Sequence, residues 1–208
     1  MRAFACVLLV FTISCGFARA AERVVDIPTR PGVTQRFLLI SPPDAKAAVI
    51  VFAGGQGGLQ MDSSGIPGRL KNNFLVRSAP LFAAQQLVVA VIDAPSDRQS
   101  PPHLLGFRNT GEHAADVKAV IAWLRQETKL PVWLVGTSRG TQSAASAAAR
   151  LARPEGPNGI VLTSTILVDK RDTPVPDMAL DRVVIPGSWC TMNRTNAARR
   201  CFATSRGS

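Results

Sequence analysis

The sequence of 208 residues has little charge, few cysteines and only two histidines. Charged side chains make up 18% of the chain and hydrophobic ones 46%. This balance excludes a disordered chain, because disordered chains combine few apolar residues with many charges. The sequence also lacks the short repeats of a solenoid and the heptads of a coiled coil. We therefore expect one globular domain with a core of its own.

Long apolar runs are also scarce, and the longest lies near the start of the chain. Residues 1–20 combine Arg2, an apolar run over residues 3–13 and a small-residue end at Ala20, which is the pattern of a secretory signal peptide. After this leader no stretch reaches the roughly 18 apolar residues that a transmembrane helix needs. We expect an exported protein, periplasmic or secreted, that starts near Ala21 and has no stable membrane anchor.

Two of the four cysteines, Cys6 and Cys15, lie in this leader. Cys15 keeps lipid attachment open as an alternative to free export, although Thr12 is a poor first residue for a lipoprotein box. The other two, Cys190 and Cys201, lie near the end of the chain. An oxidising compartment would permit them to pair, but two cysteines do not make a disulfide scaffold.

The formal net charge of +10 is concentrated at the two ends of the chain. The leader holds Arg2 and Arg19, and residues 187–208 hold four arginines and no acid, which leaves +4 for the body. That charge is ordinary for a protein surface, so we expect no nucleic-acid partner.

Short apolar runs alternate with helical patterns through the body of the chain. Several runs are apolar at every position, as parallel strands buried on both faces must be. The expected strands cover residues 36–40, 47–52, 87–92, 132–135 and 160–162, and the expected helices cover residues 110–129, capped by Thr110, and 140–151. This order predicts a mostly parallel, doubly wound α/β sheet. A further buried strand is expected within residues 181–186, and residues 187–208, which show neither period, are predicted to be an irregular tail.

One predicted strand leads directly into a motif that carries chemistry. Residues 131–140 read Pro-Val-Trp-Leu-Val-Gly-Thr-Ser-Arg-Gly, a strand that runs into G-x-S-x-G and then a helix of small residues. This context is typical of a nucleophile elbow, where a sharp turn strains the serine backbone and presents its hydroxyl above the sheet. Gly136 and Gly140 are needed because side chains there would collide. We expect Ser138 to be a nucleophile, and the alternative is an ordinary turn serine in a Rossmann-like protein.

The elbow resembles that of the α/β-hydrolase superfamily, which includes esterases, lipases and dienelactone-hydrolase-like enzymes. The resemblance extends over about residues 33–186, within a predicted domain of residues 21–186 that lacks the last strand or strands of the family. It implies a small-molecule carboxylic ester or related acyl substrate and no cofactor or metal.

A second part of this resemblance is the glycine-rich stretch of residues 54–58, which follows a predicted strand where the family carries its oxyanion loop. The resemblance implies that the backbone N–H of Arg139, together with that of Gly55 or Gln56, would hold an oxyanion. A flexible turn and a phosphate cradle are the alternatives, but the G-x-G-x-x-G spacing of a phosphate cradle is missing.

The motif lacks a histidine in the expected place. In the family an acid and then a histidine follow the serine, whereas His103 and His113 both precede Ser138. We expect both to be surface or loop residues, with a general-base role as the minor alternative. The carboxylates that follow the serine are Asp169, Asp172, Asp177 and Asp181. We therefore expect an impaired hydrolase, and the alternatives are a catalytically inactive binding protein of this fold or a non-functional fragment.

The tail suggests a reason for this gap. Codons permitted for residues 188–195, read one base earlier, can encode Val-Leu-Val-His-His-Glu-Gln-Asp, an apolar strand followed by a loop that ends in an acid. The penultimate strand of the family has this order. We hypothesise that a change of reading frame near Pro186 replaced the last strand, the acid and the later histidine.

Overall fold

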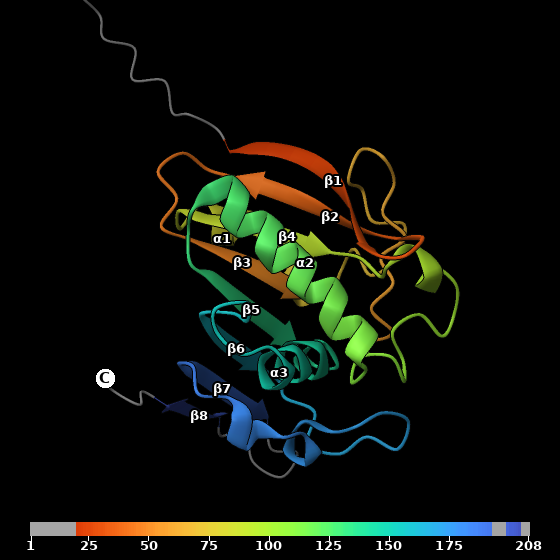
Figure 1. The fold of residues 1–208 in the computed structure, drawn as a ribbon, viewed down its shortest axis with the longest axis vertical. Helices are drawn as coiled ribbons and strands as arrows, with labels where there is room; N and C mark the ends of the chain where they lie inside the picture. The colour runs from red at the N-terminus through yellow and green to blue at the C-terminus, as the bar shows by residue number, and fades with distance from the viewer. Residues whose placement is uncertain (1–19, 193–198, 205–208) are drawn as a thin grey trace, which may run out of the picture.

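The computed structural model describes residues 20–192 and 199–204, with side chains as far as residue 188. Its described part forms one eight-stranded sheet in the order β1-β2-β4-β3-β5-β6-β7-β8 (Figure 1). The strands are β1 (Ala21–Arg30), β2 (Val33–Ser41), β3 (Ala47–Phe52), β4 (Leu87–Ile92), β5 (Val132–Thr137), β6 (Gly159–Thr163), β7 (Gly187–Met192) and β8 (Arg199–Thr204). The helices are α1 (Phe74–Ala83), α2 (Gly111–Thr128) and α3 (Gly140–Arg150), with 3₁₀ turns at Ser96–Arg98, Val175–Asp177 and Leu180–Arg182.

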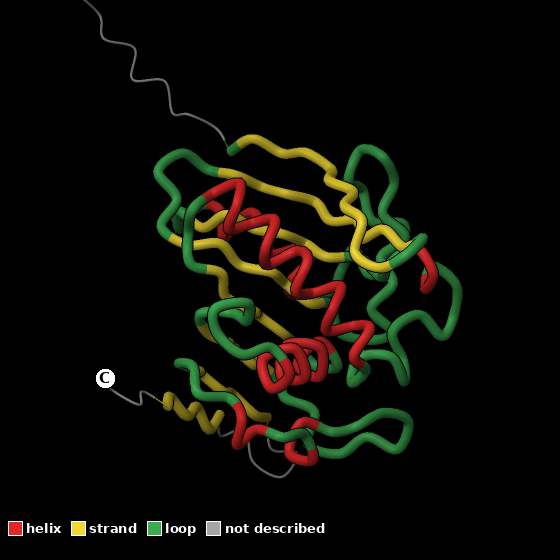
Figure 2. Tube along the Cα trace, viewed as in Figure 1, coloured by secondary structure: helices red, strands yellow, loops and turns green. Residues whose placement is uncertain are grey.

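The middle of the sheet is parallel and its two ends are antiparallel. Strands β4, β3, β5, β6 and β7 pair in parallel, while β1 and β2 form an antiparallel hairpin whose second strand joins β4. Helices α2 and α3 pack on one face of the sheet and α1 packs on the other (Figure 2). The predicted mostly parallel, doubly wound α/β sheet is confirmed.

Strand β3 shows why the central strands are apolar at every position. Successive side chains of a strand point to opposite faces. Ala48, Ile50 and Phe52 therefore pack in the core under α2 and α3, and Val49 and Val51 pack in the core under α1. Because both faces are covered, no position of β3 is left for a polar side chain.

Both predicted helices form where their patterns place them. The side chain of Thr110 accepts a hydrogen bond from the N–H of His113 at 3.1 Å, which satisfies one of the unpaired N–H groups at the start of α2. Lys129 ends α2 in the left-handed conformation, with φ of 60°. Nine of the eleven residues of α3 are buried, and most of them are alanine or serine, which lets the helix pack closely on the sheet.

The sequence patterns did not indicate β1 or α1. Strand β1 is tied to α2 by an ion pair, in which Arg30 Nε lies 2.8 Å from Oδ1 of the fully buried Asp116. Thr29 donates to the same oxygen at 2.5 Å. Helix α1 contains Pro80, which removes one backbone donor and hides the helical pattern.

The predicted irregular tail is wrong at residues 187–192 and 199–204, which form β7 and β8. Strand β7 pairs in parallel with β6, and β8 pairs antiparallel with β7. An edge strand offers unpaired N–H and C=O groups to any extended segment, so pairing there does not require a periodic side-chain pattern.

The buried strand expected within residues 181–186 does not form. Leu180–Arg182 is a 3₁₀ turn, and Val184 is 79% exposed. The predicted signal peptide lies outside the described residues, except for Ala20. Within the described part of the chain, no helix has both the length and the hydropathy to cross a bilayer.

Candidate active site

Ser138 lies in the turn between β5 and α3 and has a strained backbone, with φ of 52°. Residues with a side chain avoid this left-handed region, so the surrounding structure must hold it. The Ser138 N–H donates to the carbonyl of Thr163 at 3.1 Å, and its own carbonyl accepts from the N–H of Thr141 at 3.0 Å. The residue stays partly exposed at the end of the strand. The turn therefore has the conformation that the G-x-S-x-G motif predicts.

The two glycines of the motif leave no space for a side chain. A Cβ at Gly136 would lie 2.5 Å from the carbonyl oxygen of Gly140. A Cβ at Gly140 would lie 2.1 Å from the carbonyl oxygen of Phe52, at the end of β3. Both contacts are with backbone atoms, so relief would require the strands or α3 to move. Steric closeness explains why the motif has glycine at both positions.

The glycine-rich loop reaches Ser138 through Gly54. A Cβ at Gly54 would lie 3.0 Å from the Cβ of Ser138 and 3.3 Å from the side-chain nitrogen of Asn73. Gly55 follows with φ of +63° and is exposed. The loop and the turn therefore meet at one place, and Asn73, which caps α1, lies beside them.

Several backbone N–H groups near Ser138 are free to act as hydrogen-bond donors. In the described part of the chain, no acceptor is found for the N–H groups of Gly54, Gly55, Gln56 and Arg139. Arg139 directly follows Ser138 and is the N-cap of α3, where the helix dipole adds positive potential. Free N–H groups beside a strained serine can hold the oxygen of a developing alkoxide.

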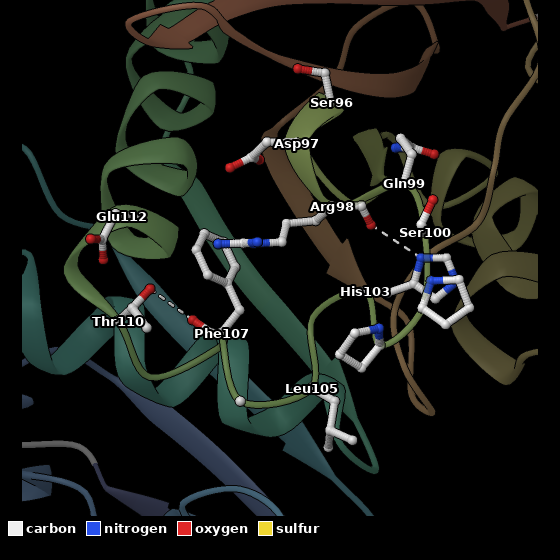
Figure 3. A pocket seen from close by; sticks show the side chains of 13 residues that line it. Ser96, Asp97, Arg98, Gln99, Ser100, His103, Leu105, Phe107, Thr110 and Glu112 are labelled. Atoms are coloured by element: carbon white, nitrogen blue, oxygen red, sulfur yellow. Dashed lines mark hydrogen bonds between the residues drawn. The ribbon is translucent and has the colours of Figure 1, made fainter.

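His103 is buried, and its ring contacts residues other than Ser138. Its Nδ1 lies 3.1 Å from the carbonyl oxygen of Arg98 and its Nε2 has no partner among the described residues. The ring packs so closely on Gly58 that a Cβ there would lie 2.3 Å from Nδ1. The ring lines a cavity of about 590 Å³ within residues 96–112 (Figure 3), whose lining does not include Ser138.

His113 lies in the core between two aromatic rings. Its ring centroid is 5.6 Å from that of Phe107 and 6.3 Å from that of Phe52. Neither ring nitrogen has a hydrogen-bond partner within the described residues. Burial, together with the positive charges of Arg108 and Arg30, lowers the pKa of His113 to about 3. His103 lies in a loop, as expected, although it is buried, whereas the expectation is wrong for His113, which is a buried residue of α2. Neither one hydrogen-bonds to Ser138.

The carboxylates that follow Ser138 have separate roles. Asp169 accepts from Nε of Arg139 at 2.8 Å, and Asp172 accepts from the N–H of Gly106 at 3.2 Å. Asp177 and Asp181 are exposed. The Arg139–Asp169 pair and the position of Asn73 were not expected from the sequence, because a lone Arg or Asn carries no pattern.

Neither a protein-family model nor a curated protein matches the chain. Among solved structures, a dienelactone hydrolase from Anabaena variabilis is similar with a TM-score of 0.61 and 22% identity, over 82% of this chain and 73% of that one. A cold-adapted esterase from an Arctic intertidal metagenomic library has a TM-score of 0.57 and 16% identity, over 82% and 71%. An α/β hydrolase from Penicillium has a TM-score of 0.52 and 16% identity, over 71% and 47%.

Because the sequence identity to these structures is 22% or lower, the similarity shows the fold alone. The strand order of the sheet and the similarity to solved hydrolase structures point to the same fold. The chain therefore has the α/β-hydrolase fold.

Proposed function

We propose that this protein is an exported serine hydrolase that acts on small carboxylic esters or related acyl substrates. Ser138 would attack the substrate carbonyl, and the N–H of Arg139 with those of Gly55 or Gln56 would hold the oxyanion. The observation that carries the proposal is the strained, partly exposed Ser138 with Gly54 packed against it. The dienelactone hydrolase and esterase among the similar structures support a small-molecule substrate.

We further propose that this hydrolase is impaired. A serine hydroxyl is a weak nucleophile until a base accepts its proton, and a histidine does this in the usual triad. The sequence has two histidines, and the hydrogen bonds and ring contacts of both involve other residues. Free backbone donors and substrate binding alone leave about 10³- to 10⁴-fold acceleration over water in well-studied proteases. We therefore expect slow but measurable turnover.

A fluorophosphonate probe tests the nucleophile. The purified protein and its Ser138→Ala variant are incubated with the probe, and the labelled residue is identified by mass spectrometry. Labelling of Ser138, absent in the variant, supports the hydrolase. Ser143 is the internal control. It lies within α3, and its buried hydroxyl should stay unlabelled.

If folded protein is not labelled at Ser138, the inactive binding protein of the same fold becomes the better reading. If no folded protein is obtained, the non-functional fragment does. The hypothesis of a changed reading frame near Pro186 stays a prediction, and gene sequencing tests it. An intact downstream strand, acid and histidine in the shifted frame would support it, and their absence there would contradict it.

Export also stays a proposal. Expression of the full chain with a C-terminal epitope, followed by fractionation, should place the protein outside the cytoplasm with an N-terminus near Ala21. An N-terminus at a lipid-modified Cys15 would support the anchored alternative.

A further inference from the structure

Arg108 is a buried cation close to the glycine-rich loop. Only 1% of the residue is exposed. Within the described residues its guanidinium forms no hydrogen bond or ion pair with a carboxylate. A buried charge without a counterion costs free energy, so its position calls for a physical explanation. Burial lowers the pKa of Arg108 to about 10, so the group stays charged at neutral pH.

The guanidinium connects the loop to α3. One terminal nitrogen, Nη1, donates to the hydroxyl of Ser143 at 2.7 Å. The other, Nη2, donates to the carbonyl of Gly55 at 3.1 Å and more weakly to that of Ala53 at 3.5 Å. Because Ser143 lies on the helix that Ser138 precedes, Arg108 fixes the loop relative to the elbow.

These two carbonyls set the direction of two of the free N–H groups, those of Gly54 and Gln56. In a planar trans peptide the N–H points opposite to the C=O of the same unit. The Ala53 carbonyl faces Arg108, so the N–H of Gly54 points away from it. The Gly55 carbonyl faces Arg108 too, so the N–H of Gln56 also points away. A cation on the carbonyl side polarises the peptide and strengthens its N–H as a donor.

The loop is shaped around this side chain. A Cβ at Gly57 would lie 2.6 Å from Nη2 of Arg108 and 2.7 Å from Cδ1 of Leu104. Gly57 also has φ of +83°, which a residue with a side chain rarely adopts. The glycine therefore leaves the space that the guanidinium occupies.

We propose that Arg108 is a positioning residue, whose guanidinium holds the carbonyls of Ala53 and Gly55 and thereby orients the loop N–H groups as oxyanion donors. This inference rests on the proposed serine hydrolase. Arg108 is buried beneath the loop and does not touch substrate.

Two variants test it. Arg108→Gln loses the charge and the forked geometry, and Arg108→Lys keeps the charge but offers a single point donor. The phosphonyl oxygen of a fluorophosphonate takes the place of the oxyanion, so the maximal inactivation rate reports on the donors. We expect that rate to fall about 10- to 100-fold in R108Q, less than the 10²- to 10³-fold loss typical of removing a donor outright, and less again in R108K. The probe concentration for half-maximal rate should stay unchanged.

Arg150→Gln is the matched control. Arg150 donates to the carbonyl of Asn109 at 2.8 Å and to the hydroxyl of Ser146 at 3.3 Å, so this variant loses similar hydrogen bonds without touching the loop. Its rate should stay within about twofold of the unmodified protein, as expected for an exposed residue. Equal slowing in all three variants, or wild-type rates in folded R108Q and R108K, would overturn the proposal.

Hydrogen exchange separates this inference from the proposed function. The N–H of Leu104 donates to the loop carbonyl of Gln56 at 2.9 Å, so peptides covering residue 104 should exchange faster in R108Q and R108K than in R150Q, whether or not Ser138 reacts. If Ser138 is not labelled but exchange is faster in R108Q and R108K, the proposed hydrolase is contradicted. The role of Arg108 in holding the loop is then still supported. Unchanged exchange would sink the role of Arg108 itself. If R108Q does not fold, R108K carries both measurements.

Discussion

Arg139 Nε lies 2.8 Å from Oδ2 of Asp169, which joins the residue after the proposed nucleophile to the loop that follows β6. Burial raises the pKa of Asp169, but hydrogen bonds from Arg139, the N–H of Arg171 and Gln142 outweigh it, so the pKa lies below its ordinary value of 3.8. The stabilisation is therefore present at neutral pH and is lost as the pH falls below that ordinary value.

Asp169→Asn should lower the free energy of unfolding by about 1.5–3 kcal/mol at pH 7, the usual range for hydrogen bonds to charged groups. The difference should shrink in acid, where the carboxylate is protonated in both states. Urea unfolding at several pH values measures it. Asp177→Asn, at an exposed position, is the control and should change little. Equal effects of the two variants would show that the ion pair contributes nothing.

Gly140→Ala tests the contact between α3 and β3. Its Cβ would lie 2.1 Å from the carbonyl oxygen of Phe52, so backbone must move, and overpacking of this kind costs about 1–3 kcal/mol or more. Gly111→Ala is a matched control because a Cβ there has no atom within 4 Å. It should be neutral or stabilise the protein by about 0.4–1 kcal/mol. Thermal unfolding distinguishes them, and similar melting temperatures for both variants would contradict the close packing at Gly140.

His113 should make the free energy of unfolding depend on pH in the acidic range. Its pKa is about 3 in the folded protein and 6.5 as the ordinary value, so the unfolded chain binds more protons between these limits. Stability is therefore lost as the pH falls from 6.5 towards 3, by up to about 1.4 kcal/mol per pH unit. His113→Leu should flatten this dependence, which urea unfolding between pH 7 and 4.5 measures. An unchanged slope in the variant would mean that the ring is solvated in solution.

Cys190 and Cys201 are directly opposite in the antiparallel pairing of β7 with β8. Opposed residues on such strands have Cα atoms about 4.5–5.5 Å apart, within the range that a disulfide spans. Oxidised glutathione should therefore convert the two thiols to an internal disulfide and release two reduced glutathione molecules. Thiol titration in denaturant and peptide mapping measure this, with Cys201→Ser as control. Free thiols or mixed disulfides alone would indicate that β8 does not pair in this register.

Much of the fold can be read from the sequence. The runs over residues 47–52 and 87–92 correspond to β3 and β4 residue for residue, because a strand covered on both faces must be apolar throughout. The turn at Ser138 is equally local, because its flanking glycines, the strand before it and the helix after it are contiguous in the chain. The strained backbone was predictable for the same reason.

The patterns failed where partners distant in the chain decide the structure. Strand β1 is held by its pairing with β2 and by the Arg30–Asp116 ion pair, and neither leaves a periodic signal in the strand itself. Strands β7 and β8 form along the open edge of β6 through backbone groups, which every residue except proline supplies in full.

The sequence by itself determined the central strands, helices α2 and α3 and the conformation of the turn at Ser138, since these depend on neighbours within a few residues. Only the tertiary structure decided that Gly54 meets Ser138, that Arg108 lies buried beneath the loop and that both histidines hydrogen-bond or pack elsewhere. Gly54 and Ser138 are 84 residues apart, and Arg108 and Gly55 are 53 residues apart, and a single polar residue carries no periodicity to predict its partner. The physical reason is that burial and hydrogen bonding of an isolated side chain are set by how the layers pack.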